Sequence, residues 1–281
     1  MTLRVLIHNV GHGQSIHAFT PAGEVVVIDL GCSESFSPLE WLHNQTQTID
    51  SLIITHPHGD HIDEMLKIKS LGFKVRQLWR PNWLPKDEVY KQNQASYTGK
   101  LDRYFEISDA YNSPIAAGER VGDPAVSGGF SIEQFSSSSC GVSNINNHSG
   151  VVVFSYSGSK IIVPGDNEPA SWNVLKEQPG FQKTVRNADI FMASHHGRSS
   201  GYESSLFGLF KPSLCVISDG RVQDTDATNR YLYHANGWTV HRKNDGTSNE
   251  RNCLTTRSDG FVDINLGSNS NGKNYLSVTV E

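Results

Sequence analysis

Cysteine is scarce in this chain. Only four cysteines occur among 281 residues, and no two of them form a C-x-x-C pair; they are Cys32, Cys140, Cys215 and Cys253. The wide spacing excludes a dense disulfide framework and does not indicate a cysteine zinc site. We therefore expect a reducing, cytoplasmic setting.

Long apolar runs are also missing. Runs such as VVVI and VVVF are far shorter than the roughly 18 residues of a membrane helix, and the N-terminal stretch lacks a signal-type cleavage site. The net charge of -5 argues against a generally basic surface, so contact with nucleic acid would need a local positive patch. Because 37% of the residues are hydrophobic, a chain of this length can still bury a sizeable core. These features predict a folded protein without a membrane segment.

Strand and helix patterns alternate in the first third of the chain. A helix is expected after Ser37, because Pro38 suits a first helical turn and Glu40 stands at capping-box spacing. Strands are expected at 3–8, 15–19, 25–29 and 50–55. A second, amphipathic helix is expected within or just after residues 55–61, with an apolar face formed by Ile62, Met65, Leu66 and Ile68.

The pattern loosens from about residue 80 to 130, which we interpret as an insertion or lid with helices at 86–92 and 99–111. Strands resume at 130–135, with a hairpin around 157–160 and further strands at 188–194, 213–218, 238–242, 253–257, 261–265 and 275–280. Helices are expected near 170–178, 202–210 and 226–235. Two strand-rich halves, each followed by helices, predict two sheets packed face to face with helices outside. We expect a single domain spanning residues 1–281.

The segment THPHGDH, residues 55–61, follows one of the predicted strands. Pro57 keeps the backbone extended, so His56 and His58 can point the same way and bind one metal ion. A lone histidine at a helix entrance more often bonds to backbone and water. Four potential ligands within six residues make that reading improbable.

The second half of this segment faces a different way. Gly59 permits a sharp reversal of the chain, after which Asp60 and His61 can face a second metal position. Ligands from one loop rarely complete two metal sites, so further ligands are expected at strand ends elsewhere.

Two segments supply such residues directly after predicted strands. Asp166 follows IIVPG, and by itself it would be an ordinary turn or cap residue. His195 and His196 follow IFMAS, where two buried imidazoles would need partners. Together these residues favour a metal site over a polar loop.

The segment HPHGDH matches the H-x-H-x-D-H signature of the metallo-β-lactamase superfamily. The order of the surrounding motifs resembles the hydrolase domain of ComEC-type DNA-uptake competence proteins. The matching segments are residues 9–31, 52–61, 146–166, 193–201 and 212–218. They span most of the chain in the expected order.

The resemblance implies a four-layer αββα sandwich with a two-metal site along one edge of its sheets. The implied ligands are His56 and His58 for the first ion, Asp60 and His61 for the second, Asp166 as the bridge, and His196 as the last ligand of the second ion. His195 is then a neighbour that orients a ligand or contacts substrate, although the two adjacent histidines could exchange roles. Asp29 resembles a buried acid that supports the metal-binding loop.

Two departures from the family pattern matter. Asn9 and Gln14 stand where many ComEC-type domains carry acids, so a charge-dependent role there is absent. The third ligand of the first ion is a histidine in most of the superfamily but is often missing in ComEC-type domains. We predict His148 for this position; otherwise it is an exposed loop histidine.

Two divalent ions at such a site would lower the pKa of a bridging water and hold the attacking and leaving oxygens of an ester. Asp60 would orient the hydroxide, and a protonated His195 would assist the leaving group. Ligands without cysteine suit zinc or manganese. We therefore expect a metal-dependent hydrolase, a phosphodiesterase or nuclease acting on DNA. The alternatives are hydrolysis of a small ester, lactam or phosphorylated metabolite, and a non-catalytic metal-binding regulatory module.

Residues 70–105 give limited support for a phosphodiester substrate. They hold seven cationic side chains against three carboxylates, a net charge of +4: Lys74, Arg76, Arg80, Lys86, Lys91, Lys100 and Arg103 against Asp87, Glu88 and Asp102. Aromatic residues are interleaved, namely Trp79, Trp83, Tyr90, Tyr97, Tyr104 and Phe105. Such a mixture can follow phosphates and stack bases. It is equally typical of a core covered by solvated lysines.

Overall fold

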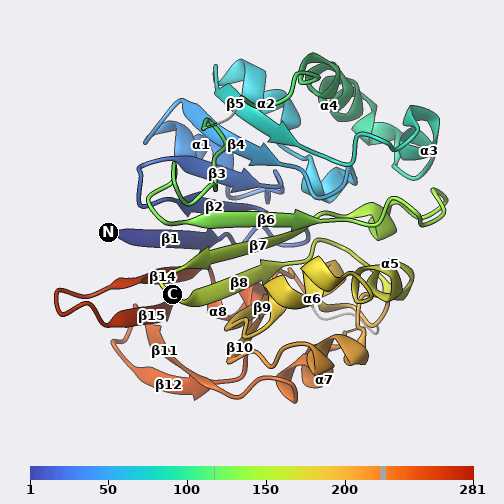
Figure 1. Cartoon of the computed structure of the whole chain (residues 1–281). Coiled ribbons are helices and arrows are strands. Elements are labelled where there is room, and N and C mark those ends of the chain that lie inside the picture. Colours follow the sequence, from blue (N-terminus) through green and yellow to red (C-terminus); the bar gives the residue numbers. More distant parts are fainter. Residues whose placement is uncertain (117, 222–225) are drawn as a thin grey trace.

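The computed structural model describes residues 1–116, 118–221 and 226–281, and the described chain forms two β-sheets that lie face to face (Figure 1). The larger sheet has the order β12-β11-β15-β14-β1-β2-β3-β4-β5, and the smaller has the order β13-β10-β9-β8-β7-β6. Residue 117, within the segment predicted as an insertion, lies outside the described residues.

Strands of the larger sheet come from both ends of the chain. They are β1 (Thr2–Ile7), β2 (Ile16–Phe19), β3 (Val25–Ile28), β4 (Thr48–Ile53), β5 (Lys74–Trp79), β11 (Trp238–Arg242), β12 (Ser248–Arg251), β14 (Val262–Ser268) and β15 (Asn274–Val280). The smaller sheet contains β6 (Ser131–Phe135), β7 (Val151–Tyr156), β8 (Ser159–Val163), β9 (Ile190–Met192), β10 (Leu214–Ile217) and β13 (Cys253–Thr255). Strand β1 pairs antiparallel with both β2 and β14, which joins the two ends of the chain in one sheet.

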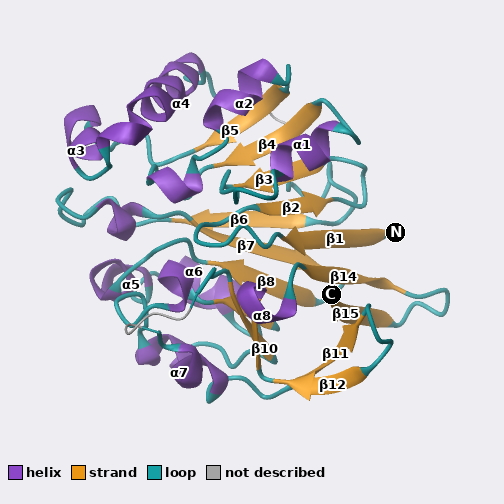
Figure 2. Cartoon of the chain, turned by 180° about the vertical axis from the view of Figure 1, so that it is seen from behind, coloured by secondary structure: helices purple, strands orange, loops and turns teal. Residues whose placement is uncertain are grey.

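Helices cover the outer faces of both sheets, as Figure 2 shows from behind. Those packed on the larger sheet are α1 (Pro38–His43), α2 (Met65–Ser70), α3 (Lys86–Lys91) and α4 (Thr98–Ala110). Those of the second half are α5 (Pro169–Leu175), α6 (Pro179–Val185), α7 (Thr228–Leu232) and α8 (Thr256–Asp259). The predicted αββα sandwich is confirmed. No helix within the described residues is long and apolar enough to cross a membrane.

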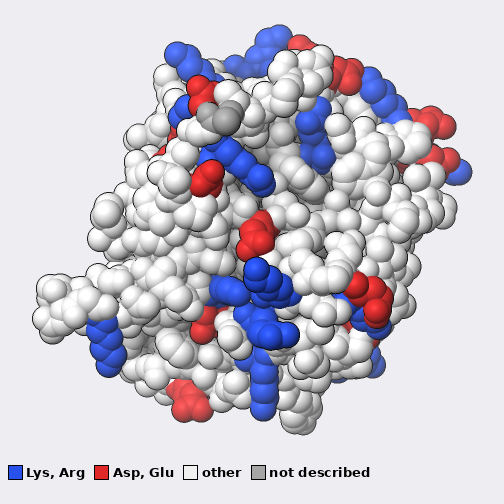
Figure 3. Space-filling model, viewed as in Figure 1, with Lys and Arg blue, Asp and Glu red and all other residues white. Residues whose placement is uncertain are grey.

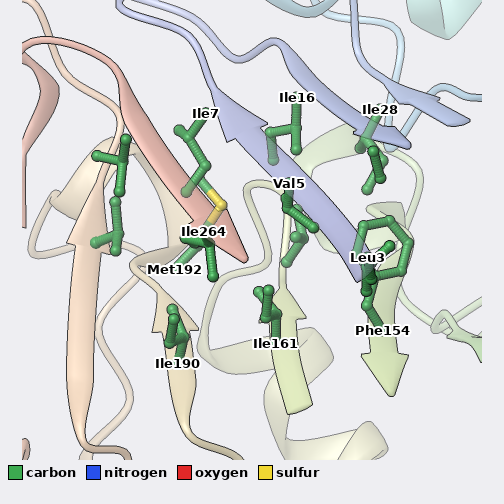
Figure 4. Packing of buried hydrophobic residues seen from close by; sticks show 14 of the residues in the cluster. Leu3, Val5, Ile7, Ile16, Ile28, Phe154, Ile161, Ile190, Met192 and Ile264 are labelled. Atoms are coloured by element: carbon green, nitrogen blue, oxygen red, sulfur yellow. The ribbon is translucent and has the colours of Figure 1, made fainter. Parts of the chain in front are cut away.

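The space between the sheets is filled by branched aliphatic and aromatic side chains (Figure 4). Val5 and Ile264 come from adjacent strands of the larger sheet, while Phe154 and Ile161 come from the smaller one. All four are fully buried. Because successive side chains of a strand point to opposite faces, the neighbouring positions form two further cores, one beneath the helices on each sheet.

Local signals predicted the start of α1 correctly. The Ser37 side chain accepts a hydrogen bond from the backbone N–H of Glu40, with Pro38 in the first turn. Glu64, a buried carboxylate, also accepts from the backbone N–H of Leu39. The helix is therefore capped both by its own residue and by a group that arrives from the segment before α2.

Some elements were missed or differ from the prediction. Strands β5 and β12 and helices α6 and α8 were not predicted, and the helix expected at 202–210 is only a 3₁₀ segment, η5 (Ser204–Gly208). Leu66, placed on the apolar face of α2, is 50% exposed. Met65 and Ile68 form the buried face of this six-residue helix. That face is too narrow to include Leu66 as well, so Leu66 points towards solvent.

Two histidines lie buried beneath α1, outside the predicted site. His8 Nε2 and His17 Nδ1 are 3.1 Å apart, and both rings contact Trp41. Burial, aided by Arg4, lowers the pKa of His8 to about 4. Burial and the neighbouring His8 lower the pKa of His17 well below its usual value. Both rings are therefore neutral in the folded protein near neutral pH.

This pair predicts a loss of stability in mild acid. Below pH about 6.5, the pKa of an unfolded histidine, His8 is protonated in the unfolded chain but stays neutral in the folded protein. The free energy of unfolding therefore falls by about 1.4 kcal/mol per pH unit for this residue, until the pH reaches its folded pKa. Urea unfolding of the His8→Gln variant should show a shallower decline between about pH 6.5 and about pH 4. The exposed His241, changed to Gln, is the control and should leave the slope unaltered. Equal slopes for all three proteins would contradict the prediction.

Candidate metal centre

The loop after β4 brings three histidines and an aspartate to the edge of the sandwich. The 3₁₀ segment η1 (Gly59–His61) begins directly after His58, and the backbone N–H of His61 donates to the His58 carbonyl at 3.0 Å. His56 and His61 are fully buried, whereas His58 and Asp60 are partly exposed. The loop thus has a buried side with His56 and His61 and a partly exposed side with His58 and Asp60, a division that differs from the expected pairing of His56 with His58 and of Asp60 with His61.

The loops after β8 and β9 reach the same place. Asp166 Oδ1 lies 3.4 Å from His61 Nε2, and Asp166 Oδ2 lies 3.9 Å from His56 Nε2. His196 Nε2 is 3.3 Å from Asp166 Oδ2 and 3.3 Å from Asp60 Oδ2. Residues from three separated segments therefore meet, which is the arrangement expected from the sequence.

The histidines and aspartates at this edge form two groups, and within each group the potential ligand atoms lie within 4.8 Å of one another. The first is buried and contains His56, His61 and Asp166; the second opens to solvent and contains His12, Asp60 and His196. The groups adjoin, because His61 Nε2 and His196 Nε2 are 3.3 Å apart. His61 was expected beside Asp60, but it borders both groups and lies closer to Asp166.

Hydrogen bonds aim the ring nitrogens of two histidines into the cluster. His61 Nδ1 donates to Asp29 Oδ2 at 2.7 Å, and His196 Nδ1 donates to the carbonyl of Ser218 at 3.0 Å. With Nδ1 carrying the proton, Nε2 of each ring is left as the lone-pair donor that a metal requires. Both Nε2 atoms face the carboxylates.

The segment carrying His195 and His196 is strained. Both residues have left-handed backbone conformations, with φ of 51° and 53°, which cost roughly 1–2 kcal/mol each. The 3₁₀ segment η4 (Ser194–Gly197) is held by the backbone N–H of His195 and the hydroxyl of Ser194, both donating to the carbonyl of Gly165. Strain of this kind persists where surrounding contacts impose it, typically at functional sites.

Charges in the cluster favour a cation. Burial alone would lower the pKa of His61, but the carboxylates of Asp166, Asp29 and Asp60 outweigh it and hold the pKa well above the usual value. The same balance of burial against Asp166 and Asp60 raises the pKa of His196 to about 10. Burial would raise the pKa of Asp166, yet His196 and His61 hold it well below its usual range. The donor set and its negative potential fit a divalent metal ion.

Two of the predicted ligands, His58 and His148, belong to neither of these groups. His58 Nδ1 is 2.9 Å from His56 Nε2, which places it beside the buried group. His148, in η3 (Ile145–His148), belongs to neither group; its Nδ1 accepts a hydrogen bond from Trp83 Nε1 at 3.0 Å. His148 therefore stands apart from both ligand groups, with its ring held against a side chain of the 80–130 segment, and its role as a ligand stays a prediction.

His195 stands beside the cluster, as expected. Its Nε2 is 3.8 Å from Asp166 Oδ2, and its Nδ1 lies 3.3 Å from Glu168 Oε1 and 2.9 Å from Ser200 Oγ. Glu168 is itself held by the side-chain amides of Asn144 and Asn146. This carboxylate can orient the His195 ring, a role that the sequence analysis did not assign to Glu168.

Sequence reasoning also missed His12. It lies between β1 and β2, and its Nε2 is 3.2 Å from Asp60 Oδ2. The available signal was the triplet Gly-His-Gly at 11–13, shortly after the strand predicted at 3–8. Glycines at that place indicate a tight loop at the sheet edge, and the histidine between them is a potential ligand.

Segment 80–130 packs against the metal-binding loop. The Tyr97 ring lies over Gly59 so closely that a Cβ there would overlap it, and Asn93 Nδ2 donates to the carbonyl of Pro57 at 3.0 Å. Lys100 pairs with Asp63 at 2.7 Å just beyond the loop. These contacts fix the loop from outside and explain why residue 59 must lack a side chain.

A model of the metallo-beta-lactamase superfamily matches residues 11–206, more than half of the chain. The chain therefore belongs to the metallo-beta-lactamase superfamily, and it is a metal-dependent hydrolase of that superfamily.

One solved structure with a similar arrangement of the chain is the metallo-beta-lactamase fold protein YhfI from Bacillus subtilis. It is 12% identical in sequence, the match covers 89% of this chain and 99% of that chain, and the TM-score is 0.48. A putative metal-dependent hydrolase from Parabacteroides distasonis has 14% identity, covers 81% of this chain and 88% of its own, and gives a TM-score of 0.42. A diphosphatase of the PhnP family has 13% identity, coverage of 89% and 98%, and a TM-score of 0.42. No curated protein matches the sequence.

Replacing Asp29 by Asn should weaken metal binding. The substitution keeps the shape of the side chain but places an amide where three side chains and a backbone N–H now donate, so His61 loses its orienting partner. We expect metal affinity to fall by about 10–100-fold, measured as zinc retained against a competing chelator. Asp263→Asn, which removes a carboxylate paired with the exposed Arg4, is the control. Unchanged zinc retention in Asp29→Asn would contradict this role.

The contact between Gly59 and Tyr97 predicts that the cost of a side chain at position 59 depends on the Tyr97 ring. Gly59→Ala should cost about 1–3 kcal/mol of stability through overpacking, measured by urea unfolding. Adding Tyr97→Ala should recover most of that cost, because the ring that overlaps the new methyl group is gone. A double variant that adds the two losses instead would show that Tyr97 is not what excludes a side chain at position 59.

Proposed function

We propose that this chain is a phosphodiesterase that uses two divalent ions, zinc or manganese, and that DNA is its substrate. The observation that carries the proposal is the pair of adjoining ligand groups, one buried and one open. The buried group suits an ion held by protein ligands alone. The open group suits an ion that also meets substrate.

Several residues hold the ions in this proposal. His56, His58 and Asp166 bind at the buried position, Asp60 and His196 bind at the open one, and His61 lies between them. Divalent ions bound in this way supply Lewis acidity to water and to a phosphoryl oxygen. The resemblance of the sequence motifs to ComEC-type domains supports a DNA phosphodiester as the substrate class.

The residues of the chain have their own tasks in this reaction. Asp60, partly exposed and adjoining His196, orients the attacking water. His195 donates a proton to the departing oxygen, with its Nδ1 side turned to Glu168 and Ser200. Glu168 keeps the ring oriented so that Nε2 remains on the side of Asp166.

A hollow beside the open group can receive an anionic substrate. It has a volume of about 830 Å³ and is lined by Gly11, His12, Glu34, Arg198, Asp219, Gly220 and Arg221. Asp219 is paired with Arg257 at 2.5 Å, so its charge is compensated. Arg198 and Arg221 bring two positive charges to this lining beside the Glu34 carboxylate, and guanidinium groups are well suited to phosphate oxygens.

A second candidate function, hydrolysis of a small ester, lactam or phosphorylated metabolite, is favoured by the structure of residues 70–105. Most of the cations in that range have partners: Arg76 with Asp50, Lys86 with Asp109, Lys91 with Glu88, Lys100 with Asp63, and Arg103 with Glu106. Tyr104 and Phe105 are buried in the core. Along the edge where α3 and α4 lie, Figure 3 shows basic and acidic atoms interspersed rather than a basic track. Under this second candidate function, the cations of residues 70–105 serve as solvated partners of nearby carboxylates and not as a surface for DNA.

One experiment separates these functions. Protein stripped of metal and reloaded with Zn²⁺ or Mn²⁺ is incubated with single- and double-stranded DNA, a model phosphodiester, a small carboxylic ester and a lactam. We expect cleavage of DNA and of the model phosphodiester, and a loss of at least about 100-fold in kcat/KM for Asp60→Asn. Asp263→Asn is again the control.

The outcomes are distinct. Hydrolysis of the small ester or lactam without cleavage of either DNA would replace the DNA proposal by the second candidate. Full activity of Asp60→Asn would show that the reaction takes place elsewhere on the protein.

A further inference from the structure

His12 approaches the open ligand group from a segment that carries none of the predicted ligands. Its Nε2 lies 3.2 Å from Asp60 Oδ2, and its ring centre lies 4.6 Å from that of His196. The ligand atoms of all three residues lie within 4.8 Å of one another. Two imidazoles and one carboxylate thus converge from three different loops.

The loop that carries His12 is fixed by its backbone. The N–H of Gln14 donates to the carbonyl of Asp60 at 3.3 Å, and the hydroxyl of Ser218 donates to the carbonyl of Gly13 at 2.8 Å. A Cβ at Gly13 would lie 2.6 Å from the Asp60 carbonyl oxygen. The loop therefore rests directly against the residue whose carboxylate His12 meets.

Close packing continues on the other side of His12. A Cβ at Gly220 would lie 2.8 Å from backbone atoms of Gly11, so the chain after β10 also presses on this loop. Gly11 and Gly13 have positive φ of 69° and 128°, conformations that glycine adopts without strain. Two glycines and two packed backbones place this one side chain at the open group.

An ordinary surface ion pair between His12 and Asp60 does not account for this arrangement. The side chain of His12 is 51% exposed, so a hydrogen bond to Asp60 alone would contribute little. The same carboxylate oxygen, however, is also 3.3 Å from His196 Nε2, whose Nδ1 is already occupied by Ser218. An oxygen between two imidazole nitrogens, each on a constrained backbone, fits the donor set of a metal site.

We propose that His12 is a ligand of the metal ion at the open position, together with Asp60 and His196. This inference rests on the two-ion centre proposed above. Three protein ligands with solvent on the remaining side leave room for substrate, as in catalytic zinc sites. Two nitrogen donors and one oxygen donor favour zinc over manganese at this position.

The test is a titration of the full-length, metal-free protein with Co²⁺, followed by visible absorption and by competition with a chelator. The wild type should bind two equivalents. In His12→Ala and His12→Gln the first equivalent should bind as in the wild type, while the affinity for the second falls by at least about tenfold and its absorption spectrum changes. His241→Ala, which removes an exposed histidine bonded only to Ser248, is the matched control and should match the wild type.

The two proposals fail in different ways. A wild type that binds two Co²⁺ ions, with both His12 variants identical to it in affinity and spectrum, overturns the role of His12 and leaves the two-ion centre standing. A wild type that binds fewer than two ions overturns the two-ion centre, and the His12 inference with it. Unchanged binding of the first equivalent shows that the variants are folded.

Discussion

The carboxylate of Asp29 holds together the segments on which the metal centre depends. It accepts hydrogen bonds from Gln14 Nε2, from the backbone N–H and hydroxyl of Thr55, and from His61 Nδ1, at 2.7 to 2.8 Å. Asp29 adopts a left-handed backbone with φ of 57°, which aspartate tolerates better than most residues. Fully buried, it is compensated by donors from the β1–β2 loop, the end of β4 and η1.

The candidate metal centre has two sides that differ in their exposure to solvent. One side is closed, because His56 and His61 are fully buried behind Asp166. The other side is open at Asp60 and His12 and continues into the arginine-lined hollow. In the proposed two-ion centre, the buried position would be closed to solvent and the open position would be accessible to substrate. The division follows from the reversal of the chain at Gly59, where the Tyr97 ring packs on Gly59 and the backbone of Gly13 packs on Asp60.

Much of the fold could be predicted because its signals are local. The alternation in β1 and β2, the cap at Ser37 and the helices α3 and α4 all depend on neighbouring residues. Strand β5 was missed because its exposed lysine and arginine conceal a strand that pairs with β4. The charge balance of residues 70–105 could not be read from that range alone for a related reason: the partners of its cations, such as Asp50 and Asp63, lie outside it.

The sequence by itself determined which histidines and aspartates follow strand ends, from the motif at 56–61 to Asp166 and His196, and so predicted the candidate ligands and their order along the chain. It also determined the four-layer class of the fold. Only the tertiary structure decided which donors meet: it brings His12 to Asp60, places His61 between the two groups and holds His148 against Trp83. The reason is physical, because distances between loops far apart in sequence are set by how the two sheets pack and how each loop backbone is fixed. Those contacts leave no local pattern in the sequence.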